Sequence, residues 1–176
     1  MSDLPIQIVD AHNNPVGGAM KEEAWTKGLI QRVVRISVLD GKGRMLLQKR
    51  SLKMALFPGR WDNSAAGHVD TGETYEEAAA HELEEELGLK GMKLRKVGDY
   101  YSESTYEWRK LNRFTRAYEL VLKNPPSGFT CSDGEVIATE WMTIAKVKRL
   151  IRDHPEQVTD GLEQILERYF RPGQSH

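Results

Sequence analysis

Apolar and polar residues alternate in one stretch of the first half of the chain. Apolar residues occupy every second position over residues 34–38, an Asp40-Gly41 pair follows, and a second apolar run begins at Met45. This alternation is typical of a strand with one buried face, and an Asp-Gly pair between two such runs is typical of a hairpin turn. Residues 32–50 are therefore predicted to form a β-hairpin.

A second hairpin is predicted near the N-terminus, where short apolar runs lie either side of Asn13, Asn14 and Pro15. We expect residues 1–24 to form an N-terminal hairpin extension. Glycine and proline punctuate residues 54–68, which predicts loop and short strand there.

The second half of the chain is predicted to add strands and helices. Thr143 is a typical N-cap for the helix that follows it, and Pro155 suits the first turn of the final helix. The apolar side of that final helix is formed by Val158, Leu162, Ile165, Leu166 and Tyr169. The remaining predicted elements are strands over 93–101, 112–122 and 136–142 and a helix over 75–87. Strands, a helix, strands and then helices in this order predict an α/β or α+β sandwich, with a mixed sheet packed between helices.

Composition limits the number of domains and the kind of partner. With 176 residues, 39% of them hydrophobic, the chain is expected to form a single domain over residues 1–176. The 25 basic and 26 acidic residues nearly cancel, so no overall field favours a nucleic acid polymer or a membrane surface. No run of the sequence approaches the ~18 apolar residues of a membrane span.

Cysteine usage and the N-terminal residues favour a reducing compartment. Cys131 has no second cysteine to pair with, and residues 1–10 lack the basic start and apolar run of a secretion signal. We therefore expect a cytoplasmic protein. Cys131 lies in a polar turn beside Ser132 without a histidine nearby in sequence, so it is not expected to be a nucleophile.

The segment over residues 67–89 concentrates negative charge on a predicted helix. Thr74 and Glu77 have the spacing of a capping box at its N-terminus, and Gly88 is placed to end it. At ~100° per residue, the helix has an acidic face and a separate apolar face. The acidic face carries Glu82, Glu85 and Glu86, and the apolar face carries Leu83, Leu87 and Ala80.

A glutamate-rich helix is commonly only a solvated face. Like charges at these spacings, however, destabilise a helix by roughly 0.2–0.5 kcal/mol per pair, which a bound cation would offset. Clustered carboxylate oxygens without cysteine ligands suit a hard ion such as Mg²⁺ or Mn²⁺.

The spacing of the whole segment favours the second interpretation, because it resembles the Nudix box, written G-x5-E-x7-R-E-U-x-E-E-x-G-U with U aliphatic. The matching residues are Gly67, Glu73, Glu82, Leu83, Glu85, Glu86, Gly88 and Leu89. The box arginine is replaced by His81. With the similar strand order around the box, the resemblance extends over about residues 30–170.

The resemblance implies a Nudix-type sandwich fold and a divalent metal held by Glu82, Glu85 and Glu86, with the Gly67 carbonyl. The implied activity is hydrolysis of a diphosphate linkage in a nucleoside diphosphate or a nucleoside-diphosphate-linked compound, a pyrophosphohydrolase reaction that uses Mg²⁺ or Mn²⁺. One of these glutamates is then the general base, and the loop residues Asp133 and Glu135 are further candidates. Their alternative interpretation is a polar turn. The expected partner is a small molecule, and the protein is a monomer or homodimer.

Three box positions are expected to be structural rather than catalytic: Glu73, His81 and Gly88. In the Nudix family the box arginine pairs with the first box glutamate, here Glu73. Histidine has a shorter reach and is charged at neutral pH only when a neighbouring carboxylate stabilises its protonated form. The box is therefore expected to be looser here.

The stretch before the helix also resembles isopentenyl-diphosphate isomerase, a Nudix-fold enzyme. His68 matches a metal-binding histidine of that enzyme, but its catalytic cysteine corresponds to Ala66. Two upstream metal-binding histidines align near Trp25 and Gln31, and the acidic pair falls around residues 110–112. Loss of the thiol removes the proton transfer, so isomerisation is the weaker alternative. A noncatalytic nucleotide-binding module is the other alternative, against which the intact carboxylate set argues.

Substrate contacts are less well determined. Arg50 aligns with a diphosphate-binding arginine of the isomerase, and His68 is expected to reach substrate or metal from the loop, unless it is only structural. Possible stacking partners for a base, each also explicable as ordinary packing, are Trp25, Tyr101, Trp108 and Phe114.

Overall fold

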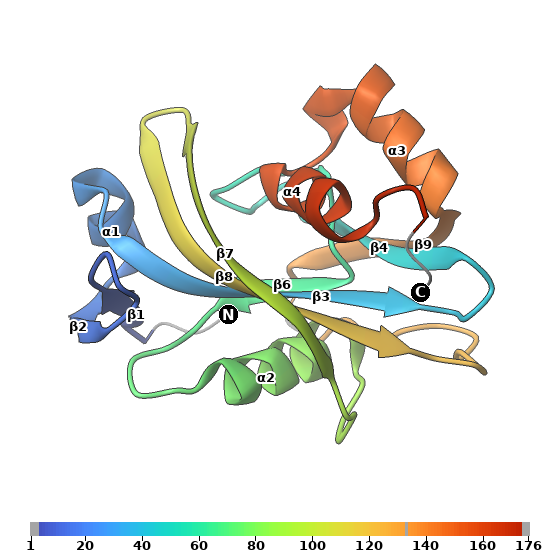
Figure 1. Ribbon diagram of the computed structural model, residues 1–176, viewed down its shortest axis with the longest axis horizontal. Coiled ribbons are helices and arrows are strands. Elements are labelled where there is room, and N and C mark those ends of the chain that lie inside the picture. The colour runs from blue at the N-terminus through green and yellow to red at the C-terminus, as the bar shows by residue number, and fades with distance from the viewer. Residues whose placement is uncertain (1–3, 133, 174–176) are drawn as a thin grey trace.

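A computed structural model describes residues 4–132 and 134–173, which fold into a nine-stranded sheet with helices on both faces (Figure 1). The strands are β1 (Ile6–Val9), β2 (Pro15–Ala19), β3 (Ile30–Leu39), β4 (Arg44–Arg50), β5 (Trp61–Asp62), β6 (Ala65–His68), β7 (Arg95–Tyr106), β8 (Arg109–Val121) and β9 (Val136–Thr143). The helices are α1 (Lys21–Lys27), α2 (Tyr75–Leu87), α3 (Ile144–Asp153), the single 3₁₀ turn η1 (Pro155–Gln157) and α4 (Asp160–Tyr169).

Strand β3 is the centre of the sheet. It pairs antiparallel with β1, β4 and β6 and parallel with β8, which forms a long antiparallel hairpin with β7. Strand β4 pairs antiparallel with both β5 and β9. The sheet is therefore mixed, and β6 leads from its middle into α2.

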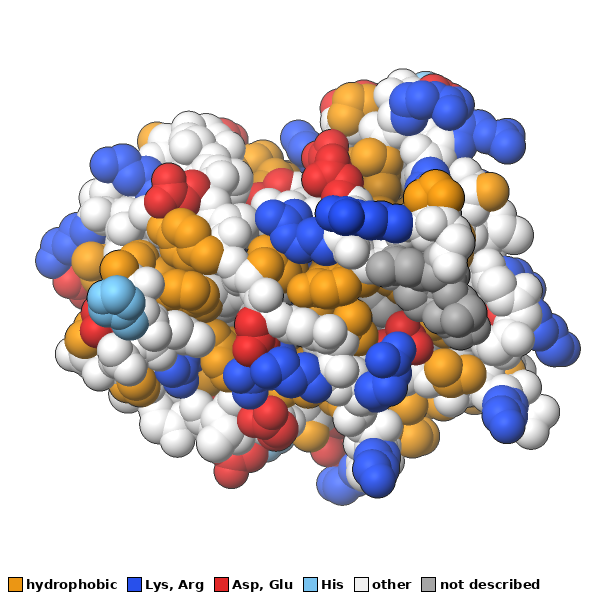
Figure 2. Space-filling model, in the orientation of Figure 1, with side chains coloured by type: hydrophobic (Ala, Val, Ile, Leu, Met, Phe, Trp, Pro, Cys, Tyr) orange, Lys and Arg blue, Asp and Glu red, His pale blue; other side chains and the backbone are white. Residues whose placement is uncertain are grey.

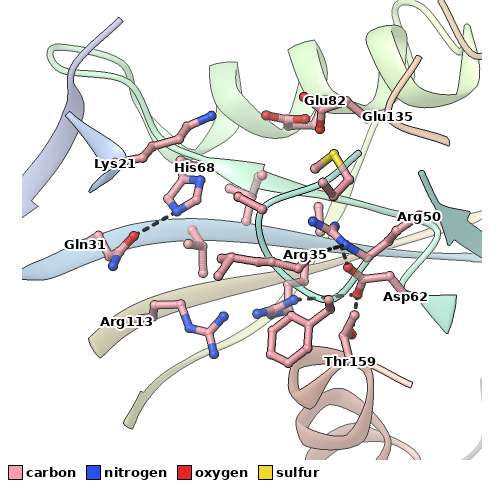
Figure 3. A pocket seen from close by; sticks show the side chains of 18 of the residues that line it. Lys21, Gln31, Arg35, Arg50, Asp62, His68, Glu82, Arg113, Glu135 and Thr159 are labelled. Carbon is pink, nitrogen blue, oxygen red and sulfur yellow. Dashed lines mark hydrogen bonds and ion pairs between the residues drawn. The ribbon is translucent and has the colours of Figure 1, made fainter. Parts of the chain in front are cut away.

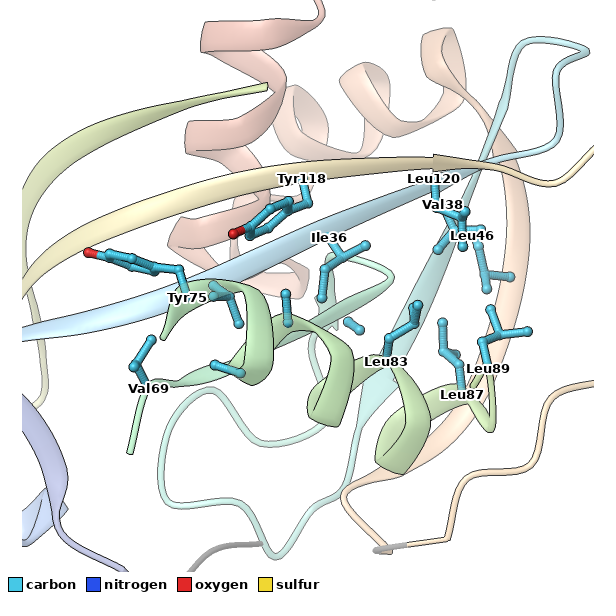
Figure 4. Packing of buried hydrophobic residues seen from close by; sticks show 14 residues of the cluster. Ile36, Val38, Leu46, Val69, Tyr75, Leu83, Leu87, Leu89, Tyr118 and Leu120 are labelled. Atoms are coloured by element: carbon cyan, nitrogen blue, oxygen red, sulfur yellow. The ribbon is translucent and has the colours of Figure 1, made fainter. Parts of the chain in front are cut away.

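Helix α2 covers one face of the sheet (Figure 4). The alternating residues Val34, Ile36 and Val38 of β3 point towards it and pack with Leu83 and Leu87, all buried. The predicted alternation is thus confirmed. The helix turns Ala78 and Ala79 into this core, whereas Ala80, which we expected on the apolar face, is exposed.

Helices α3 and α4 cover the opposite face, where Met45 and Leu47 of β4 pack with Val147, Leu162 and Ile165. The predicted sandwich of a mixed sheet between helices is confirmed.

Both ends of α2 lie where the sequence signals place them. The Thr74 hydroxyl accepts a hydrogen bond from the Glu77 backbone N–H, and the Glu77 carboxylate accepts one from the Thr74 backbone N–H. Gly88 adopts a left-handed conformation with φ of 70°, and its N–H bonds to the last carbonyls of the helix. Local chemistry therefore sets the position of the glutamates.

The final helix begins later than expected. Pro155 starts the 3₁₀ turn η1 instead, and α4 begins at Asp160 because the Thr159 hydroxyl caps it by accepting the Leu162 N–H. Val158 precedes α4 but is still buried against it.

The N-terminal region also differs in part from expectation. Strands β1 and β2 form the predicted hairpin, but β1 also pairs with β3 and so extends the main sheet. Residues 21–27 form helix α1, which was not predicted, and it ends at Gly28. Strands β7 and β8 both extend beyond the predicted limits towards their common turn. The sequence did not predict this extension, because most β7 side chains are not buried and leave no apolar pattern.

Charged side chains of both signs are interspersed over the face shown in Figure 2, in keeping with the balanced composition. Among the described residues, no helix is long and apolar enough to cross a membrane.

Candidate active site

A cavity of about 360 Å³ lies beside the central strand β3. Its walls come from α2, from β6 and the loop before it, and from the beginning of α4 (Figure 3). Glutamates line one side of the cavity and arginines line the other. The sequence-predicted residues that line it are Trp25, Arg50, Gly67, His68, Glu73, His81, Glu82, Glu85 and Glu135.

The acidic side is formed by Glu82 and Glu85 of α2 and by Glu135, which immediately precedes β9. Burial raises the pKa of Glu82 to about 8, and the neighbouring Glu135 and Glu85 carboxylates act in the same direction. The loop before β9 is held against α2, because Ser132 donates hydrogen bonds to the Glu85 carbonyl from its N–H and its hydroxyl. The structure thus brings Glu135 to the helix glutamates, whereas Asp133 lies outside the described residues.

Gly67 approaches Glu82 so closely that no side chain fits between them. A Cβ atom at position 67 would lie 1.9 Å from Glu82 Oε1. The glycine therefore lets a carboxylate oxygen lie against the backbone of β6.

Glu86 lies beneath the cavity, not on its wall, and is only 1% exposed. Its Oε2 accepts hydrogen bonds from Gln48 Nε2 and from the Ala66 N–H, both at 2.8 Å. Burial, followed by the charge of Glu82, raises the pKa of Glu86 well above its ordinary value. Glu82 and Glu86 are close enough to repel, but only Glu82 lines the cavity.

The first box glutamate is held by two contacts at the edge of the cavity. Glu73 Oε1 lies 2.5 Å from His81 Nδ1, and Glu73 Oε2 accepts a hydrogen bond from the Asp70 N–H at 3.0 Å. His81 thus bridges from α2 to the loop before it.

The basic side of the cavity is organised around Asp62 at the end of β5. Arg50 donates to Asp62 Oδ2 at 3.1 Å, Arg35 Nη1 lies 3.9 Å from Oδ1, and the Thr159 hydroxyl donates to Oδ1 at 2.7 Å. Burial alone would raise the pKa of Asp62, but the two guanidiniums more than offset it and hold the pKa below its ordinary value.

A second buried ion pair completes this side. Arg113 of β8 pairs with Asp160, the first residue of α4, and also donates to Ser104 Oγ at 3.0 Å. Gly161 follows in α4, and a Cβ there would lie 1.8 Å from Arg35 Nη1, so the glycine makes room for the guanidinium. The start of α4 therefore forms part of the cavity wall.

His68 lies between the two sides and is half-buried. Its Nε2 is 2.8 Å from Gln31 Oε1. Burial, with the nearby positive charges of Lys21 and Arg113, lowers the pKa of His68 well below its ordinary value, so the ring is neutral. Trp25 is a further wall residue, with its ring 6.2 Å from that of His68.

The fold and this site agree with the comparisons to known proteins. The NUDIX domain family matches residues 29–164. The chain belongs to the Nudix family. Two glutamates of the Nudix box, Glu82 and Glu85, therefore line the cavity.

Relatives with two kinds of name are among those that match this chain. One is isopentenyl-diphosphate Delta-isomerase 2 of Photorhabdus laumondii, 32% identical over 93% of this chain and 91% of that protein. Another is an uncharacterized Nudix hydrolase of Pseudomonas aeruginosa, 40% identical over 54% of this chain and 57% of that protein. A crystal structure of a Deinococcus radiodurans protein is similar with a TM-score of 0.75 and 26% identity, over 94% of this chain and 99% of that one.

Apart from His68, the positions that the sequence resemblance pairs with isomerase residues have different side chains in this Nudix protein. His68 contacts Gln31, an amide, and Trp25 presents an indole to the same cavity. Ala66, the position that the sequence resemblance pairs with the isomerase cysteine, has no thiol, and Asn112 donates its side-chain amide to the Gly28 carbonyl. Among the positions that the sequence resemblance pairs with metal-binding residues of the isomerase, only His68 has a side chain that commonly binds metal.

The Nudix glutamates fit a divalent cation by their chemistry. The donors are carboxylate oxygens, and Gly67 leaves room for a close approach to the backbone. Burial, with the neighbouring Glu135 and Glu85 carboxylates, raises the pKa of Glu82, and a cation would offset this cost. Within residues 4–132 and 134–173, no three His, Cys, Asp or Glu side chains already converge as metal ligands. Glu86 in particular is engaged by Gln48.

Several cavity residues were not predicted from the sequence. They are polar residues inside strands or at a helix start: Gln31, Arg35, Asp62, Arg113, Thr159 and Asp160. Gln48, which contacts Glu86 beneath the cavity, was not predicted either. Polar residues on strands are ordinarily expected to face solvent. The sequence signal for burial was therefore only their position among apolar neighbours, as for Gln48, which follows Leu46 and Leu47.

Proposed function

We propose that this Nudix protein hydrolyses a diphosphate linkage in a small molecule, a nucleoside diphosphate or a nucleoside-diphosphate-linked compound, with Mg²⁺ or Mn²⁺. The observation that supports this most directly is the meeting of Glu82, Glu85 and Glu135 on one wall of a cavity whose other wall carries Arg50. Carboxylates for cations and a guanidinium for phosphate oxygens are the two requirements for binding a diphosphate.

The metal ligands are proposed to be Glu82, Glu85 and Glu86, with the Gly67 carbonyl. A divalent cation bound there supplies charge neutralisation of the diphosphate and a lowered pKa of bound water. Gly67 allows Glu82 to lie against β6. Gln48 and the Ala66 N–H orient the carboxylate of Glu86.

The remaining residues are proposed to orient the substrate and accept a proton. Arg50, fixed by Asp62 and the Leu56 carbonyl, binds a phosphate oxygen. As a water oxygen bonds to phosphorus, the bridging P–O bond breaks, the leaving phosphate takes the bond electrons, and a carboxylate takes the water proton. The candidates for that base are Glu82, Glu85, Glu86 and Glu135, and all except Glu86 line the cavity.

The test is product release from a panel of nucleoside di- and triphosphates, nucleotide sugars, dinucleotides and isopentenyl diphosphate, with Mg²⁺, with Mn²⁺ and with EDTA. The panel is run on the wild type and on Glu85→Gln. We expect metal-dependent turnover that falls in Glu85→Gln by more than the roughly 10–100-fold typical of residues that only support a ligand. Glu84→Gln is the matched control, because Glu84 is exposed on the same helix and pairs with Lys90.

Three results would contradict the proposal. Equal turnover in Glu85→Gln and Glu84→Gln would remove Glu85 from the ligand set. Conversion of isopentenyl diphosphate to its allylic isomer, followed by NMR, would instead assign the isomerase activity for which one relative is named. Binding of panel members without any turnover would assign a noncatalytic module.

A further inference from the structure

The arginine side of the cavity carries more positive than negative charge. Three guanidiniums, Arg35, Arg50 and Arg113, share two carboxylates, Asp62 and Asp160. Arg35 and Arg113 are each only 5% exposed, so water does little to screen them. The glutamates lie across the cavity from these arginines (Figure 3). Within the part of the chain that the structure describes, these guanidiniums therefore outnumber by one the carboxylates with which they form ion pairs.

Arg113 has an incomplete set of hydrogen-bond partners. Its hydrogen bonds to Asp160 and Ser104 both come from Nη2, and its Nε has no hydrogen-bond partner among the described residues. Burial lowers the pKa of Arg113; Asp160 opposes this shift and the positive charge of Arg35 adds to it. The guanidinium is buried without enough negative charge around it.

Other unpaired groups at this end are also mostly donors. Arg35 Nε, Gln31 Nε2 and Trp25 Nε1 are buried and lack a hydrogen-bond partner in the part of the chain that the structure describes. All three residues line the cavity. An apolar ligand would leave these donors and the extra positive charge desolvated, whereas an anionic group would satisfy both.

We propose that this side of the cavity, at Arg113 with Arg35 beside it, binds an anionic group, a carboxylate or a phosphate, that the substrate carries in addition to its diphosphate. The inference rests on the proposed function, because it assumes that the diphosphate lies at the glutamates and Arg50. It defines the substrate class as diphosphates with a second, distal anion.

Three synthetic diphosphates of matched length test this inference on the intact protein. They are pentyl diphosphate, with an apolar tail, 4-carboxybutyl diphosphate and 4-phosphooxybutyl diphosphate. We expect kcat/KM for at least one anionic tail to exceed that for the pentyl compound by about 10- to 100-fold, the range of a charged hydrogen bond. The two anionic tails distinguish a carboxylate from a phosphate. Binding is also measured by calorimetry with EDTA, which needs no turnover.

Substitutions locate the preference within the cavity. Arg113→Gln removes the charge and should reduce the preference to less than about threefold, whereas Arg113→Lys retains the charge and should preserve part of it. Arg116→Gln is the matched control, since Arg116 lies on the same strand but pairs with Asp99 and Glu76 outside the cavity. Thermal unfolding of each variant shows whether it is folded.

The outcomes separate this inference from the proposed function. Metal-dependent turnover with equal kcat/KM for all three tails would overturn the inference and leave diphosphate hydrolysis standing. Tighter binding of an anionic tail, lost in Arg113→Gln but without turnover, would support the inference and count against hydrolysis. Equal binding of all three tails by the wild type in EDTA would overturn the inference, even if the Arg113→Gln variant were unstable. Equal effects of Arg113→Gln and Arg116→Gln on the preference would overturn it as well.

Discussion

His81 Nδ1 lies 2.5 Å from Glu73 Oε1, so the histidine at the position of the box arginine contacts the first box glutamate. The pair joins α2 to the loop that carries the Asp70 N–H, itself bonded to Glu73. His81 is 66% exposed in its side chain, so an ion pair here contributes at most about 1 kcal/mol to stability. The contact matters for the position of the loop more than for the stability of the fold.

Replacement of His81 tests this positioning role. His81→Arg should leave kcat/KM unchanged or raise it, because arginine has the longer reach and a planar set of donors that matches the Glu73 carboxylate. His81→Ala should lower kcat/KM while the thermal midpoint changes by only a few degrees. A clear loss of activity in His81→Arg would show that the imidazole has a role of its own.

Gly67→Ala should disturb the acidic wall without unfolding the protein. The added Cβ would lie 1.9 Å from Glu82 Oε1 and must displace that carboxylate. We expect activity to fall by about a hundredfold, as for misplacement of a reacting group by ~1 Å. The free energy of unfolding should fall by roughly 1–3 kcal/mol.

Gly128→Ala is the control for this change, because a Cβ at residue 128 meets no atom within 4 Å. Activity assays and urea unfolding are run on both variants. Unchanged activity in Gly67→Ala would show that the position of Glu82 against β6 is not required.

Asp62 should make stability depend on pH in a predictable direction. Its pKa in the folded protein is lowered, because Arg50 and Arg35 outweigh the effect of burial. A lowered folded pKa means that the ionised carboxylate contributes its full stability above the unfolded pKa of about 3.9, and that this contribution is lost as pH falls through the folded pKa.

Asp62→Asn should therefore lower the free energy of unfolding at pH 7 by about 3–5 kcal/mol, since it leaves Arg50 and Arg35 buried with less negative charge. Urea unfolding from pH 7 to pH 3 should show the difference from wild type shrinking below about pH 4. Asp153→Asn, at an exposed position, serves as the control. A difference that stays constant to pH 3 would mean that Asp62 is not ionised in the folded protein.

The helix that carries the glutamates could be predicted to the residue, because its signals are local. Thr74, Glu77 and Gly88 lie within one turn of the ends that they determine. The alternation along β3 likewise gave the face that packs on α2, since a period of two needs no knowledge of the partner.

The arginine side of the cavity could not be predicted, because its partners are distant in sequence. Arg35 lies on the face of β3 opposite to Val34 and Ile36, where a charged residue is ordinarily expected in solvent. Its guanidinium is buried because it contacts Asp62 and packs against the start of α4. The start of α4 lies more than 120 residues after Arg35 in the sequence. The start of α4 at Asp160, rather than at Pro155, also involves a residue distant in sequence, because the capping residue Thr159 donates a hydrogen bond to Asp62.

The contribution of Thr159, Asp160 and Gly161 to the cavity has a consequence for synthesis of the protein. A nascent chain that has emerged only as far as β9 already contains every glutamate of the acidic wall, but Arg35 and Arg113 have not yet met Asp160. The arginine side of the cavity is thus completed only after every strand of the sheet has been synthesised. Any shortening of the chain that removes α4 is expected to abolish substrate selection before it abolishes the glutamate cluster.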